Sequence, residues 1–504
     1  MSSGILIATS AVFGLLVIVA AIYFVVYFQH PDDKWVAWFP KVVVIIGLTL
    51  ACYNVFLLPL DVANQSGSLV AKGSIPMTKL NLAFYIITII ICIVGVPFTV
   101  LFYEGADESD SDDDGRSSGS ALGYAIKWMV PIALFSGGII TVCYWFLGYA
   151  NVATIKITSQ LIQSGSQSIS IDYCAPVAGG PTIPVGICTY ASGHVYVSVS
   201  PLVYIVAVVS FVGWIVFAVF GGVGLVSLPM DLVQSFIHRP KRITALQYQE
   251  RKTFVGQQAQ LLMEAGKTLQ EELKDMRRSG NTGRRYRTVK NRENEFRKDV
   301  LILEYHYRRL EDSYKNQGGN FLWQIAQLIG GCVGSVLSLV WIIHICVYLI
   351  PVELQVSPLS LFLNSFFISV NSVPFLGTAF YAMFAFYLLG CVVKGNAKLG
   401  MRLFFVTLHP MKIGETLMSS LVFNMGIILL CSLSVSQFCT LAFSRFAAYT
   451  ANAAIFGVQI QNINGLEYGY DILIFALLGF ALFTAIGYLY SPYKKQRENL
   501  LPFQ

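Results

Sequence analysis

One histidine, His344, lies in the middle of a long apolar run, inside the segment Trp341-Ile-Ile-His-Ile-Cys-Val. A charge inside such a run is costly to bury, so an ionisable residue there marks a functional site by default. At this position His344 could relay a proton or hold a ligand. Such a histidine more often hydrogen-bonds a neighbouring helix. We therefore take His344 as a candidate intramembrane polar site and keep both interpretations open.

Four carboxylates, Asp61, Glu104, Asp231 and Asp471, lie at the ends of apolar runs, where we expect water to solvate them. Two of these ends share the pattern Leu-Pro-x-Asp. Because proline lacks an N–H and crowds the preceding turn, the pattern predicts that a helix ends or kinks at Pro59 and at Pro229.

Glycines precede the second of these prolines and permit close helix approach. We name the following set the junction residues and predict that they form a hinge where the membrane bundle joins the cytosolic hairpin: Gly221, Gly222, Gly224, Pro229 and Asp231. The alternative is that both patterns are ordinary helix endings.

The sequence carries little that resembles a catalytic or metal-binding motif. The sequence has no GxxxxGK[ST], HExxH, GxGxxG or CxxC pattern, and its six histidines lack metal-ligand spacing. One GxSxG pattern, at 115–119, lies in an acidic linker without the strand and helix of a nucleophile elbow. We therefore expect a protein that is not an enzyme, with no catalytic residues, no metal site and no cofactor.

The composition indicates what must position these residues. Of the 504 residues, 55% are hydrophobic and only 12% are charged, which is about half the charge of a soluble domain. Apolar runs of bilayer-spanning length predict an all-α polytopic bundle of about nine transmembrane helices. We place the spans near 4–27, 41–60, 81–103, 124–149, 200–227, 321–350, 370–393, 416–443 and 471–489.

The distribution of basic residues predicts the orientation of this bundle. With the N-terminus outside, only four of the 34 Lys and Arg residues lie on the outer side, namely Lys72, Lys79, Lys156 and Arg445. Basic residues favour the cytosolic side, so we expect an outer or lumenal N-terminus and a cytosolic C-terminus. The net charge of +6 then reflects topology, and we expect no nucleic-acid partner.

Two modifications are candidates on the outer side. The sequon Asn64-Gln65-Ser66 predicts N-glycosylation at Asn64. The outer loop 150–199 contains Cys174 and Cys188, which we expect to form a disulfide in an oxidising compartment, with two free thiols as the alternative. Its Val195–Val199 stretch alternates like a short strand, and the loop is the candidate surface for an outer ligand.

The long loop 228–320 carries two heptad ladders separated by Ser279-Gly-Asn-Thr-Gly283. This pattern predicts a cytosolic antiparallel coiled-coil hairpin over 243–315, a candidate site for a cytosolic protein partner. The alternative is a solvated charged surface. The predicted organisation is spans 1–5 in 1–227, with an acidic cytosolic loop at 104–123, the hairpin in 228–320, spans 6–9 in 321–489 and a cytosolic tail at 490–504.

Several stretches resemble the LIMR family of nine-span membrane proteins, in particular its plant-type members. They are QHPDDKW (29–35), LLPLDVAN (57–64), PFTVLFYEG (97–105), FGGVGLVSLPMDLVQSFIHRPK (220–241), LHPMKIGETLMSSLVFNMGIILLCSLSVSQFC (408–439) and IFGVQIQNINGLEYGYD (455–471). The family includes a receptor-like protein for lipocalins and a lysosomal protein associated with cobalamin export. It provides no catalytic or ligand-binding motif to carry over.

The resemblance, the hairpin and the missing catalytic motifs together predict a multi-pass membrane receptor or a trafficking or signalling scaffold. The alternative is a small-molecule transporter or a transporter accessory subunit, as in cobalamin export. We expect the chain to be embedded in the plasma membrane or in an endomembrane, with lysosome and vacuole both open.

Overall fold

The structure of the chain is a computed structural model. It describes residues 3–30, 33, 38–65, 75–110, 119–159, 188–237, 239, 241–278, 284–315, 320–354, 356–373, 376–399, 401–403, 406–409, 411 and 416–490. The chain divides into two compact units, Met1–Ser227 with Leu337–Thr484, and Leu228–Val336 with Ala485–Gln504.

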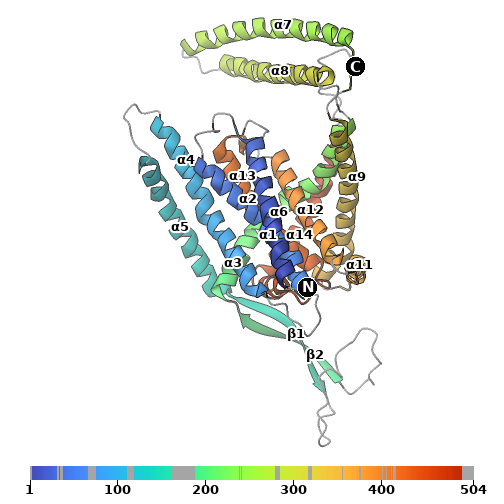
Figure 1. Cartoon of the computed structure of the whole chain (residues 1–504). Helices are drawn as coiled ribbons and strands as arrows, with labels where there is room; N and C mark the ends of the chain where they lie inside the picture. Colours follow the sequence, from blue (N-terminus) through green and yellow to red (C-terminus); the bar gives the residue numbers. More distant parts are fainter. Residues whose placement is uncertain are drawn as a thin grey trace, which may run out of the picture. The chain divides into compact units, whose positions relative to one another are not determined.

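Helices dominate the described residues, as the sequence predicts (Figure 1). The first half contains α1 (Ser3–Phe28), α2 (Trp38–Gln65), α3 (Met77–Ile90), η2 (Ile91–Gly95), α4 (Val96–Asp110), α5 (Gly119–Leu147), β1 (Tyr149–Ser159), β2 (Cys188–Ser198) and α6 (Pro201–Ile237). The second half contains α7 (Ala245–Arg278), α8 (Arg284–Tyr314), α9 (Phe321–His344), η5 (Ile345–Leu349), α10 (Ile350–Glu353), α11 (Phe362–Val370), α12 (Leu376–Leu399), β3 (Met401–Leu403), β4 (Val406–His409), α13 (Met418–Ala442), η6 (Ala453–Ile460) and α14 (Glu467–Tyr490).

Within the described part of the chain, nine helical stretches are long and apolar enough to cross a bilayer. They are Gly4–Phe28, Trp38–Gln65, Met77–Tyr103, Leu122–Leu147, Pro201–Ile237, Phe321–Glu353, Leu376–Leu399, Met418–Ala442 and Tyr468–Tyr490. Each overlaps one predicted span, so the all-α multi-pass fold class is confirmed. Apolar length alone was enough to locate the spans, because the bilayer leaves little other choice for such a segment.

Helix α13 is the most buried of these stretches, and it packs against α2, α4 and α12. Its polar side chains face neighbouring helices and make hydrogen bonds there. Asn54 Nδ2 of α2 donates to Ser432 Oγ at 2.8 Å, and Ser210 Oγ of α6 donates to Gln437 Oε1 at 2.7 Å. Polar contacts of this kind fix which helices pair inside an apolar environment.

Close backbone contacts join α6 to α12 at two glycines. A Cβ added to Gly224 would lie 1.8 Å from the carbonyl oxygen of Cys391, and one added to Gly395 would lie 2.0 Å from that of Phe220. Any larger residue at either position would force the two helices apart. The glycines of α6 therefore permit close helix packing.

The predicted helix end at Pro59 and at Pro229 is wrong, while the alternative of a kink at each proline stays a prediction. Helix α2 continues through Pro59 to Gln65, and α6 continues through Pro229 to Ile237. Pro229 has no N–H for the Leu225 carbonyl, and the hydroxyl of Ser338 on α9 donates to that carbonyl instead. Side chains of neighbouring helices can supply such missing donors, which is why membrane helices tolerate internal proline.

Strands β1 and β2 form an antiparallel ribbon, in which Tyr149 pairs with Ser198 and Ser159 with Cys188. The predicted strand near 195–199 is part of this longer ribbon. Its base is attached to the segment after η6: Asn151 N donates to Asn462 O at 2.8 Å, and Asn464 N donates to Tyr149 O at 3.2 Å. The ribbon is thereby tied to one end of the membrane bundle (Figure 1).

In the second unit, α7 and α8 form an antiparallel hairpin. Tyr248 near the start of α7 stacks on Tyr314 at the end of α8, with ring centroids 4.3 Å apart. Glu272 near the end of α7 pairs with Arg292 near the start of α8 at 3.5 Å. The predicted helical hairpin is present: α7 ends at Arg278 and α8 begins at Arg284, on either side of the predicted break at 279–283, which lies outside the described residues.

Candidate functional site

The N-terminus of α13 is held by a buried carboxylate. Asp33 Oδ2 accepts the backbone N–H of Met418, the first residue of α13, at 2.9 Å. Its other oxygen, Oδ1, accepts the hydroxyl of Tyr103 at 2.6 Å. A carboxylate at a helix N-terminus satisfies a free N–H and complements the helix dipole. Both oxygens of Asp33 therefore have partners, and the contact is a helix cap.

The C-terminus of α13 is held by the predicted polar residue His344. Its Nε2 lies 2.8 Å from the carbonyl oxygen of Ala442, the last residue of α13, so Nε2 carries the hydrogen. Asn364 Nδ2 on α11 donates to the same carbonyl at 3.2 Å. The His344 ring is sandwiched between Tyr348 and Phe443, with centroids 5.1 and 5.2 Å away. The geometry gives His344 a capping contact, while its predicted role as a relay stays a prediction.

Asp61, expected at the water boundary, is instead fully buried. Its Oδ2 accepts the backbone N–H of Asn452 at 2.9 Å and Nδ2 of Asn81 at 3.2 Å. Tyr85 Oη donates to Asn452 Oδ1 at 2.5 Å. We call these four residues the Asp61 cluster; α2, α3 and the segment that leads into η6 bring them together.

The expectation that water solvates Asp61 is therefore wrong, because α3 and the segment before η6 cover it. A signal was present in the sequence: Asp61 and Asn64 follow the apolar run of α2 within one helical turn, and a polar residue in a span is a functional candidate. Asp471 is half-buried, and Asp231 accepts a hydrogen bond from Tyr488. The side chain of Glu104 lies outside the described residues.

The junction residues lie along the second half of α6. Gly222 packs against the backbone of α14, since an added Cβ would lie 2.5 Å from Leu477 O. Gly224 packs in the same way against the backbone of α12 at Cys391. Gly221 faces the Phe217 ring of its own helix. The helix is continuous through all five residues, so the predicted hinge stays a prediction.

The two modification sites predicted for the outer side, Asn64 and the pair Cys174 and Cys188, are only partly within the described residues. Asn64 is 8% exposed, and its Nδ2 donates to Ile75 O at 3.1 Å, so a glycan there would have to displace this hydrogen bond. Cys174 and the side chain of Cys188 lie outside the described residues, as does much of the 150–199 loop. The predicted disulfide and glycan both stay predictions.

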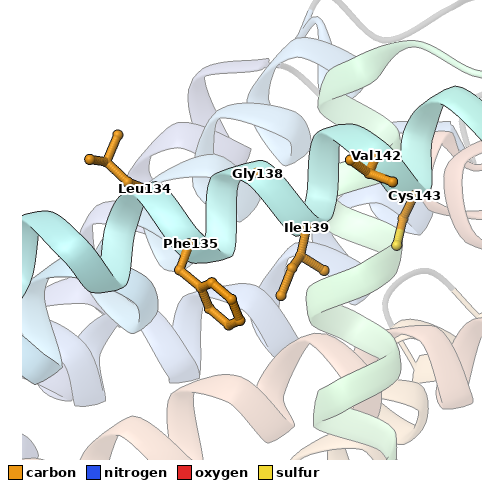
Figure 2. A pocket seen from close by; sticks show the side chains of 6 residues that line it. All are labelled: Leu134, Phe135, Gly138, Ile139, Val142 and Cys143. Atoms are coloured by element: carbon orange, nitrogen blue, oxygen red, sulfur yellow. The ribbon is translucent and has the colours of Figure 1, made fainter.

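Two surface pockets differ in chemistry. One lies along α5, has a volume of about 420 Å³ and is lined by Leu134, Phe135, Gly138, Ile139, Val142 and Cys143. Figure 2 shows Phe135, Ile139 and Cys143 on one side of α5 and Leu134 on the other. Such an apolar surface suits lipid chains. The other, about 290 Å³, lies on the hairpin and is lined by both apolar and charged residues, among them Leu262, Glu272 and Arg292.

Among the described residues, no group of three or more His, Cys, Asp or Glu side chains is placed to hold a metal ion. The arrangement is that of a multi-pass helical membrane protein in which polar side chains, Asp33 and His344, hydrogen-bond the two ends of α13.

Comparison with known proteins agrees with this class. The model of the LMBR1-like membrane protein family matches residues 5–301 and 286–486. A LIMR family protein of Dictyostelium discoideum is 38% identical over 97% of this chain and 98% of its own length. LIMR family proteins of Oryza sativa subsp. japonica and Arabidopsis thaliana are 34% and 36% identical, over 98% and 96% of this chain and 97% and 95% of their own lengths. No solved structure matches the chain.

The chain therefore belongs to the LIMR family, and the predicted resemblance is confirmed. Its placement as an integral, multi-pass membrane protein follows from the family and from the nine apolar helices of the described residues.

Proposed function

We propose that this protein is a non-catalytic membrane receptor or trafficking scaffold, with a partner surface on the hairpin and a ligand surface on the β1–β2 ribbon. The observation that carries the proposal is a contrast in packing. The membrane helices are tightly packed, whereas the α7–α8 hairpin and the β1–β2 ribbon expose apolar side chains to solvent. A receptor needs surfaces that bind partners, and the hairpin and the ribbon are the candidates for such surfaces.

The packing of the membrane core supports a structural role for the spans. Backbones of α6 and α12 approach closely at Gly224 and Gly395, and α13 is almost wholly enclosed by its neighbours. Aromatic rings fill the space between helices: Trp214, Phe217 and Phe438 lie within 5.6 Å of one another, centroid to centroid. Interiors packed in this way transmit strain and resist sliding.

The ribbon supports the ligand surface. Three consecutive residues of β2, Val195, Tyr196 and Val197, are all exposed, Tyr196 by 69%. Tyr149 on β1 contacts the Tyr196 ring edge-to-face at 5.8 Å. Exposed tyrosine next to apolar groups is typical of binding surfaces, because it offers contact area and one hydrogen bond with little entropy loss.

The hairpin supports the partner surface. Its internal contacts use Val255, Leu269 and Leu310, which are buried. Leu261 and Met263 on the same helix α7 are 60% and 58% exposed and so lie largely outside that interior. Apolar side chains exposed on a charged helix are candidates for contact with another protein.

The experiment that tests this function uses the full chain with a tag at its N-terminus. The paired substitutions Leu261→Ser and Met263→Ser on the hairpin should change the steady-state membrane distribution and the rate of tag internalisation. Gly256→Ala, where an added Cβ meets nothing within 4 Å, is the control on the same helix. Unchanged distribution and internalisation, even after replacement of the whole hairpin by a flexible linker, would contradict the scaffold role.

A small-molecule transporter or accessory subunit is the second candidate, and the buried Asp61 favours it, because ionisable groups inside spans mark ion and substrate pathways. Purified protein in vesicles should then show substrate-dependent uptake from a panel that includes cobalamin, with His344→Ala as a comparison variant. No flux above empty vesicles across the panel would count against transport.

A further inference from the structure

The Asp61 cluster contains three buried polar atoms without a hydrogen-bond partner: Asp61 Oδ1, Asn81 Oδ1 and Asn452 Nδ2. Asp61 and Asn81 are fully buried, and Asn452 is 1% exposed. A carboxylate oxygen without a partner in an apolar interior is strongly destabilising, because nothing replaces the hydrogen bonds that water would have made. Something must offset that cost, and it must bring positive charge or a donor to two oxygens.

No basic side chain among the described residues does so. Within the described residues, no ion pair joins Asp61 to a lysine, arginine or histidine. Lys79 on α3 and Arg445 in the segment after α13 are both exposed, and Lys72 lies outside the described residues. The titratable groups that face Asp61 are the phenols of Tyr85 on α3 and Tyr381 on α12, which are neutral in their ordinary form. The backbone N–H of Ala451 also lies near the carboxylate.

We propose that Asp61 and Asn81 form an intramembrane proton-binding site, in which one proton on Asp61 Oδ1 is donated to Asn81 Oδ1. The amide and the carboxyl group already face each other, because Asn81 Nδ2 donates to Asp61 Oδ2. A carboxylic acid and a carboxamide side by side make two reciprocal hydrogen bonds, and the second needs the acid proton. One proton thus satisfies both orphan oxygens.

The chemistry of this step is simple. A hydronium ion of the surrounding water supplies the proton: its O–H bond breaks and leaves water, an Asp61 Oδ1–H bond forms, and the carboxyl group becomes neutral. Asn452 Nδ2 is a donor and does not compete for the proton. A metal cation would need several oxygen ligands, and the cluster has two free ones.

The site is connected to the ribbon through η6. Asn452, whose N–H binds Asp61, directly precedes η6, and Asn462 at the other end of η6 accepts the N–H of Asn151 on β1. The segment η6 is a π-helix, a form that is frequent at functional sites. Loss of the proton leaves a buried charge that must draw in water, which should loosen the start of η6 and then the ribbon base.

Infrared spectroscopy of the full chain in lipid nanodiscs tests the proton directly. Titrated across about pH 4 to 9, the wild type should show a protonated-carboxyl stretch that is absent from Asp61→Asn and is shifted in frequency and midpoint in Asn81→Ala. Asp61→Asn should fold normally, because an amide at 61 donates to Asn81 Oδ1 as the acid does. A spectrum in Asp61→Asn identical to the wild type would overturn the proposal.

Hydrogen exchange at 451–464 tests the connection. After correction for intrinsic rates, exchange in the wild type should become faster at high pH, whereas Asp61→Asn should keep the slow, low-pH value throughout. Exchange that is independent of pH in the wild type would contradict the link to η6. Exchange that follows sodium concentration at fixed pH, with N-methylglucamine as replacement, would identify a metal-cation site and overturn the proton.

Discussion

Asp33 and Asp61 are two buried carboxylates that meet the same stretch of chain at opposite ends. Asp33 accepts the N–H of Met418 where α13 begins, and Asp61 accepts the N–H of Asn452, ten residues after α13 ends at Ala442. Each also accepts one side-chain donor, from Tyr103 and from Asn81 respectively. The two sites differ in one oxygen: Asp33 has a partner for each, and Asp61 leaves Oδ1 without one.

This difference separates a structural group from a functional one. A carboxylate whose two oxygens both accept hydrogen bonds at a helix N-terminus complements the helix dipole and has no use for a further ligand. A carboxylate with a buried oxygen that accepts no hydrogen bond has to take up a proton or be paired with a positive charge. The burial of the two groups is alike, so burial alone does not reveal which of them binds a proton.

Removal of the Asp33 carboxylate should have the largest effect. Asp33→Ala removes the acceptor of the Met418 N–H and the carboxylate that accepts the Tyr103 hydroxyl, and we expect it to lower the free energy of unfolding by about 2–4 kcal/mol. Thermal unfolding in detergent measures this. Tyr103→Phe is the control that removes one partner and should cost about 1 kcal/mol. If Asp33→Ala loses no more stability than Tyr103→Phe, the hydrogen bond from Met418 N–H to Asp33 contributes little to the free energy of unfolding.

Ser338 compensates for a proline, and a double-mutant cycle tests it. Ser338→Ala leaves the Leu225 carbonyl without a donor and should cost about 1–3 kcal/mol. In a Pro229→Ala background the new N–H at position 229 can reach that carbonyl, so the same substitution should cost much less. Equal costs in the two backgrounds would show that Ser338 stabilises α9 or its neighbour Tyr387 by another route.

The contribution of His344 should be smaller, because Asn364 shares its acceptor. His344→Phe keeps the ring between Tyr348 and Phe443 but removes the donor to Ala442, and we expect a cost of about 1 kcal/mol. Paired with Asn364→Ala, the loss should exceed the sum of the single effects, since the carbonyl is then bare. In vesicles, uptake that disappears in His344→Phe while folding is retained would favour the relay interpretation.

The sequence predicted the spans well, because a span is specified locally by twenty or so apolar residues and the bilayer allows little else. The helical hairpin was equally accessible, since its two ladders and the glycine-containing break are contiguous in sequence. The β-ribbon was seen only as a short alternating stretch on one strand. Its partner β1 follows α5 directly and has no comparable flanking signal.

The polar contacts could not be predicted in the same way. The partners of Asp61 lie 20 and 391 positions away, and the donor for the Leu225 carbonyl is 113 positions away. Proline at 59 and at 229 suggested helix ends because local rules count only the missing N–H. The continuation of each helix depends on neighbours that a local pattern does not contain.

The measurement that tests the central claim most directly compares two substitutions of one kind, Asp61→Asn and Asp33→Asn, by unfolding in detergent at neutral pH. An amide at 61 satisfies Asn81 Oδ1 without a buried charge, so the free energy of unfolding should be unchanged within about 0.5 kcal/mol or higher than in the wild type. At position 33, an amide would turn its own N–H toward one of the two donors that Asp33 now accepts, the Met418 N–H and the Tyr103 hydroxyl. The free energy of unfolding of Asp33→Asn should therefore fall by about 1–3 kcal/mol. Equal losses in both variants would contradict the claim that Asp61, unlike Asp33, is held as a neutral acid.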